Sequence, residues 1–131
     1  MSLGSALYPS LTALSAFGTG LQSTAHNLAN VLTNSFKAGR VTYADRPNLS
    51  GVSARGPEKL AVSGPLVPYG PGLPPLAGSN PALPAGFVEG STTDIAAEMV
   101  NLIITSRVYQ ANAKVVPTAD SLLGMVINIR A

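Results

Sequence analysis

The sequence predicts a mainly α-helical fold: the N- and C-terminal helices pair as an antiparallel coiled coil and are joined by a Pro/Gly-rich extended arm with little or no β structure. Three observations predict it: a leucine heptad near the start, a capped helical pattern near the end, and prolines concentrated between them. The 131 residues thus divide into a helix and turn over 1–38, an arm over 39–90 and a helix over 91–131. We expect these three parts to form one domain.

The N-terminal segment combines a heptad repeat with an absence of charge. Residues 1–36 contain no lysine, arginine, aspartate or glutamate. Apolar or small residues fill two heptad rows: Leu7, Leu14, Leu21 and Leu28, then Leu11, Gly18, Ala25 and Leu32. The pattern predicts a helix from about Pro9, or a turn earlier, to about Asn30. Since a helix without a charged face is covered all round, and this chain is too small to cover it alone, we expect other chains to contribute.

Two glycines inside this predicted helix, Gly18 and Gly20, leave two interpretations open. Each costs about 1 kcal/mol relative to alanine, so the helix is weak on its own. Alternatively, the missing side chains allow the backbone of a neighbouring helix to approach closely.

The middle of the chain is rich in helix-breaking residues. Residues 39–90 hold nine of the eleven prolines and nine of the thirteen glycines. A stretch such as Tyr69 to Pro75 is compatible with neither a helix nor a central strand. The segment is too apolar for a solvated tether. We therefore expect an extended arm, at most with a short hairpin, laid on a helical surface.

The C-terminal helix has a clear start and an internal proline. Ser91 to Asp94 form a capping pattern before Ile95, and Asp94 and Glu98 lie where the helix dipole favours anions. Apolar residues follow on two faces, which predicts packing against more than one neighbour. Pro117 interrupts the pattern, and we expect a kink near Ala113 or a local break.

Composition excludes several classes of function. Charged residues make up 11% of the chain, against about a quarter in typical domains, which indicates assembly or membrane association. The chain contains no run of basic residues of the kind that would indicate nucleic-acid binding. It also contains no nucleophile-elbow, P-loop or HExxH pattern, which are signatures of enzymes. The one histidine, His26, lacks the partners of a metal or catalytic site. We expect no enzyme activity, no cofactor and no small-molecule substrate. The apolar N-terminal stretch lacks a basic n-region, so a cleaved signal peptide is not expected.

Both chain ends resemble the bacterial flagellar rod and hook proteins. The N-terminal match consists of Ala13-Leu14-Ser15-Ala16-Phe17, Ala25-His26-Asn27-Leu28-Ala29-Asn30-Val31, Thr33 and Phe36-Lys37. The C-terminal match consists of Asp94 to Ile103, Arg107 to Val115, Thr118-Ala119-Asp120 and Leu122-Leu123. The two matches cover about half of the chain in the family's order.

The resemblance implies a structural axial subunit of the flagellar basal-body rod. Family members polymerise into a hollow helical tube through paired terminal helices, after export by the flagellar type III apparatus without a cleaved signal. The implied partners are copies of this chain, other rod and hook subunits and that apparatus, and the implied location is the basal body within the cell envelope. The implied assembly interface comprises Leu14, Leu21, Asn27, Leu28, Asn30, Phe36, Met99, Leu102, Tyr109, Gln110, Asn112 and Leu122. For Asn30, capping of the preceding helix is the other interpretation.

Four departures from the family pattern keep alternatives open. His26 and Leu32 replace asparagines, Asn34-Ser35 stands where Pro-Gly or Thr-Gly is usual, and Pro117 replaces a polar residue.

The position within the flagellar axis is also left open by the resemblance. The short middle segment is typical of a proximal-rod protein, whereas the sequence from Gly86 to Ser91 is nearer to that of hook and distal-rod proteins. A hook or distal-rod paralogue with a truncated middle is one alternative. A membrane-associated amphipathic helical protein is another, although the N-terminal helix lacks the basic residues such proteins use. A soluble helical adaptor is a third.

Overall fold

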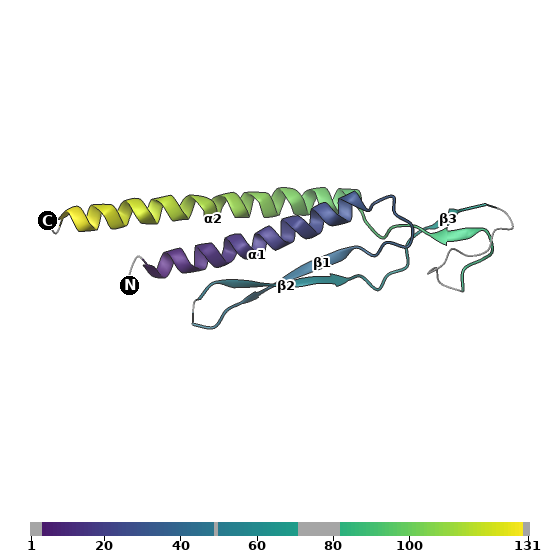
Figure 1. Ribbon diagram of the computed structural model, residues 1–131, viewed down its shortest axis with the longest axis horizontal. Helices are drawn as coiled ribbons and strands as arrows, with labels where there is room; N and C mark the ends of the chain where they lie inside the picture. The colour runs from purple at the N-terminus through teal and green to yellow at the C-terminus, as the bar shows by residue number, and fades with distance from the viewer. Residues whose placement is uncertain (1–3, 49, 71–81, 130–131) are drawn as a thin grey trace.

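Two long helices and a β-hairpin lie side by side in three layers (Figure 1). The computed structural model describes residues 4–48, 50–70 and 82–129. Helix α1 (Gly4–Ala29) and helix α2 (Ile95–Ile129) run antiparallel, so both chain termini lie at the same end. The hairpin of strands β1 (Gly39–Asp45) and β2 (Val52–Lys59) packs along α1. Helix α1 is therefore the middle layer, between α2 and the hairpin.

The absence of charge in α1 follows from this middle position. One side of the helix faces α2 and another faces the hairpin, so the chain itself covers much of a helix for which we expected other chains. The covered positions are mostly small: Ser10, Ala13, Ala16, Gly20, Ser23, Thr24 and Asn27. Small side chains let a helix and a strand pair both approach the backbone of α1. The heptad leucines Leu7, Leu14, Leu21 and Leu28 remain only half-buried.

The expectation of little or no β structure is wrong. Within the described residues the segment after α1 forms two antiparallel two-stranded sheets, β1 with β2, and β3 (Leu66–Pro68) with β4 (Phe87–Glu89). In the first sheet, Gly56 and Pro57 of β2 both lie opposite Val41, so the ladder shifts register there. A proline is tolerated at such a bulge because no ladder hydrogen bond requires its missing N–H. For the stretch from Tyr69 to Pro75 we expected neither a helix nor a central strand, and most of it lies outside the described residues.

Helix α2 begins as its sequence predicts. The carboxylate of Asp94 accepts hydrogen bonds from the N–H groups of Ala96 and Ala97, at 2.9 and 3.3 Å. The expected local break at the proline does not occur, because one helix runs from Ile95 to Ile129 with Pro117 inside it. The Ser121 hydroxyl donates to the carbonyl of Pro117 at 2.9 Å, one turn further on.

The turn after α1 contains the strained residue of this region. Ser35 has a positive φ of 60°, in the left-handed region that glycine adopts at least cost. Its N–H donates to the carbonyl of Glu89 at 2.7 Å, which anchors the turn to β4. The family pattern usually has glycine at this position, so the resemblance itself contained the signal for this conformation.

Candidate assembly surface and the polar contacts that position it

A buried polar cluster joins the C-terminal end of α1 to the start of α2 and of β1. Asn27 is 1% exposed, and its amide nitrogen donates both to Glu98 Oε1 at 2.9 Å and to the carbonyl of Gly39 at 2.8 Å. Its amide oxygen accepts the N–H of Gly39 at 2.9 Å. The Thr93 hydroxyl donates to the backbone carbonyl of Asn27 at 3.2 Å. Every polar atom of the Asn27 side chain is thus used inside the chain.

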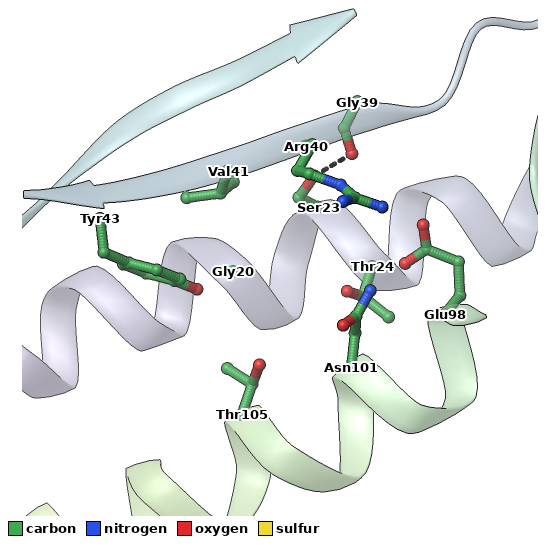
Figure 2. Close-up of a pocket in the computed structure, with 10 residues that line it drawn as sticks. All are labelled: Gly20, Ser23, Thr24, Gly39, Arg40, Val41, Tyr43, Glu98, Asn101 and Thr105. Atoms are coloured by element: carbon green, nitrogen blue, oxygen red, sulfur yellow. Dashed lines mark hydrogen bonds between the residues drawn. The ribbon is translucent and has the colours of Figure 1, made fainter. Parts of the chain in front are cut away.

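A small polar pocket lies beside this cluster, between both helices and β1 (Figure 2). It has a volume of about 140 Å³ and is lined by Gly20, Ser23, Thr24, Gly39, Arg40, Val41, Tyr43, Glu98, Asn101 and Thr105. Glu98 is buried at its edge, although the sequence suggested only a role at the helix dipole. Within the described residues no group of histidine or acidic side chains is placed to hold a metal ion.

Tyr43 connects the hairpin to both helices at this pocket. A Cβ atom built on Gly20 would lie too close to the Tyr43 hydroxyl for any real side chain, and 3.4 Å from Thr105 Cγ2. The Tyr43 ring also packs on Phe17, with ring centroids 5.0 Å apart. Burial raises the pKa of Tyr43, and a hydrogen bond with Thr105 partly offsets the rise. The space at Gly20 is therefore filled by the side chain of Tyr43 and not by the backbone of a neighbouring helix. A Cβ atom at Gly18 would meet no atom within 4 Å.

The loop end of the molecule is tied together by Lys37 and Glu89. Their side chains form an ion pair, and Lys37 Nζ also donates to the carbonyl of Val62 at 2.7 Å. The same Glu89 oxygen accepts the N–H of Gly64. The hydrogen bond from Lys37, with that from Gly64, lowers the pKa of Glu89. Sequence reasoning missed this pair because 52 residues separate its members.

The predicted interface residues fall into two groups. Those on α2 are mostly exposed: Met99, Leu102, Tyr109 and Leu122 at 56, 38, 37 and 43%, with Gln110 also exposed and Asn112 half-buried. Those near α1 are more covered: Leu14, Leu21 and Leu28 are half-buried, Asn27 is buried and Phe36 packs edge-on against His26. Asn30 caps α1 through its side chain, which donates to the carbonyl of His26 at 2.9 Å, and not through a left-handed backbone.

Helix α2 also exposes a row of mostly apolar residues, of which only Leu122 was predicted as interface. The row is exposed along one face of α2, with spacings of three, four or seven, and consists of Ile104, Ala111, Val115, Thr118, Leu122, Met125 and Ile129. We call these residues the outer stripe of α2. No described helix is long and apolar enough to cross a membrane. A helical pair with such a stripe is the architecture of a subunit that completes its packing against other chains.

Comparison with known proteins agrees with this class. Residues 85–129 match the family described as flagellar basal body rod FlgEFG protein, C-terminal. The chain is similar to the flagellar hook protein FlgE of Salmonella typhimurium, with 32% identity over 94 residues, or 70% of this chain and 23% of that protein. It is also similar to the flagellar basal-body rod protein FlgG of Borreliella burgdorferi, with 33% identity over 95 residues, or 70% of this chain and 34% of that protein.

Both the matched family model and these relatives are flagellar rod and hook proteins, and the chain is similar to them. A third relative, the basal-body rod protein FlgG of Bacillus subtilis, is 34% identical over 56 residues, or 43% of this chain and 21% of that protein. The chain therefore spans between about a fifth and a third of the length of these three relatives. Their names are those of rod and hook components, in agreement with the expectation that this chain is not an enzyme.

Proposed function

We propose that this protein is a structural axial subunit of the bacterial flagellum, built into the basal-body rod or the hook. The observation that supports this most directly is the coincidence of two features in one segment. The segment that matches the rod and hook family, 85–129, contains the helix whose outer stripe is apolar and exposed. Relatives of both kinds, rod and hook, are similar over this chain, so both positions are compatible with the proposal.

Assembly proceeds by burial of the outer stripe of α2 and of the half-buried leucines of α1. The two surfaces have matching periods, because Leu7, Leu14, Leu21 and Leu28 follow a heptad and the outer stripe alternates fours and threes from Ala111 onward. Matching periods let side chains of one helix fit between those of another. At about 25 cal/mol per Å², burial of about 1,000 Å² per subunit contributes roughly 25 kcal/mol before the entropy cost of association.

The proposal includes export through the flagellar type III apparatus and location in the rod within the cell envelope. The partners are further copies of this chain and the neighbouring rod and hook subunits. The interface set given above, from Leu14 to Leu122, belongs to this proposal with one refinement. Asn27 acts inside the subunit, where it fixes the ends of the two helices that carry the interface.

The test is incorporation into basal bodies. A strain that lacks the native gene is complemented with the wild-type chain, Leu122→Asp or Met125→Asp, and basal bodies are isolated. We expect the wild-type chain to co-purify with them and both variants to be synthesised but absent, because a carboxylate on the outer stripe would be buried unpaired. Ser121→Asp is the control, since this exposed residue lies off the stripe. Normal incorporation of both stripe variants would contradict the proposed surface, and absence of the wild-type chain would contradict the function itself.

A further inference from the structure

The apolar and small residues of the helical pair do not define a unique alignment. Residues that face the partner recur every seven positions on both helices: Ala13, Gly20 and Asn27 on α1, and Thr105, Asn112 and Ala119 on α2. The leucines of α1 repeat with the same period. If α1 slid along α2 by seven residues, small residues would again face small residues. Sixty-five residues separate the two helices in sequence, so the connection alone leaves room for such a slide.

Two cross-connections distinguish the observed alignment from one shifted by a heptad. At the loop end, Asn27 binds Glu98 at 2.9 Å inside a buried site, and a slide would leave the Glu98 side chain buried without that partner. In the middle of α1, the hydroxyl of Tyr43 occupies the space that the missing side chain of Gly20 leaves and reaches Thr105 of α2. No other residue of the central heptads offers this space, since Ala13 carries a Cβ and Asn27 an amide.

We propose that Asn27 and Tyr43 set the register of α1 on α2, and that the β1–β2 hairpin thereby acts as an alignment device for the helical pair. Buried polar groups have this role in coiled coils, where they select one alignment at some cost in stability. The apolar surface supplies the attraction and the two polar contacts choose the alignment. This proposal concerns the single chain and holds whether or not the chain assembles into a rod.

Spin-label distances test the register directly. The chain contains no cysteine, so cysteines at the exposed positions Gln22 and Lys114 would carry the only labels. A slide by one heptad moves one label about 10 Å along the axis of the other helix. The doubly labelled chain is diluted in excess unlabelled chain, so that distances within one molecule dominate the pulsed electron paramagnetic resonance signal.

The variants separate alignment from general stability. We expect one distance in the wild-type chain and in Gly18→Ala, whose new methyl group meets no atom within 4 Å. Asn27→Ala combined with Gly20→Ala should add a second distance, shifted by about one heptad. Gly20→Ala/Tyr43→Phe keeps Asn27 and removes the hydroxyl that collides with the new methyl group, so this double variant should show one distance.

Two outcomes would overturn the proposal. One is a single unshifted distance in every variant, which would mean that the remaining contacts are enough to choose the alignment. The other is loss of helical circular dichroism in the Asn27→Ala/Gly20→Ala variant without any second distance. That result would mean that the two contacts only hold the helices together.

Discussion

Lys37 and Glu89 form an ion pair between the turn that follows α1 and the strand that precedes α2. The pair joins the two chain segments that lead into the helices, and Glu89 also holds the N–H of Gly64. It is the one ion pair among the residues that the structure describes. Its position places the charge of a single carboxylate where several segments of the loop end meet.

The first prediction concerns the pH dependence of this pair. The pKa of Glu89 is lowered in the folded chain, so its contribution is present above the ordinary glutamate pKa and is lost as the pH falls through the lowered value. Glu89→Gln should therefore lower the melting temperature at neutral pH and have less effect in acid. Thermal melts of both proteins across the acid range measure the difference. Glu58→Gln on the exposed hairpin is the control, and a Glu89→Gln effect that does not vary with pH would refute the prediction.

The second prediction concerns the left-handed residue after α1. Ser35→Gly should stabilise the chain by about 0.5–1 kcal/mol, because glycine adopts the positive φ of 60° without a side-chain clash. Urea denaturation followed by circular dichroism measures the change. Asn48 has a similar φ of 62°, but asparagine tolerates this conformation better. Asn48→Gly should therefore gain less, and an equal or larger gain there would contradict the argument.

The third prediction concerns the buried amide. Asn27→Ala should cost about 3 kcal/mol of unfolding free energy, because Glu98 and the N–H of Gly39 lose this buried partner and the Gly39 carbonyl keeps only the Ser23 hydroxyl. Asn30→Ala, three residues later, removes an exposed cap and an exposed hydrogen bond from Thr33, and should cost about 1 kcal/mol or less. The two variants are compared by denaturation under identical conditions. Similar losses of unfolding free energy in the two variants would show that the buried hydrogen bonds of Asn27 stabilise the fold no more than the exposed cap does.

The fourth prediction concerns the proline inside α2. Pro117→Ala should raise stability by up to about 3 kcal/mol, since the helix continues through this position and alanine restores the missing N–H donor. Gly124→Ala, further along the same helix, should gain about 1 kcal/mol from propensity alone, as no atom lies within 4 Å of its new methyl group. Melting curves of the full chain compare them. No gain from Pro117→Ala would mean that a bend at this position is required.

The sequence by itself determined the two helices, the cap at Asp94 and the family, because these depend on local periodicity, capping chemistry and short motifs. It did not determine the β-hairpin, since the strand residues from Gly39 to Lys59 gain their stability by packing on α1 rather than from an alternating pattern of their own. Nor did it identify which residues of α1 pack against the rest of the chain. The heptad pointed to the leucines, but the tertiary structure buries the small residues, because only they let a helix and a hairpin reach the same backbone. The contacts of Tyr43 with Gly20 and of Lys37 with Glu89 join segments distant in sequence, and only the folded chain brings these residues together.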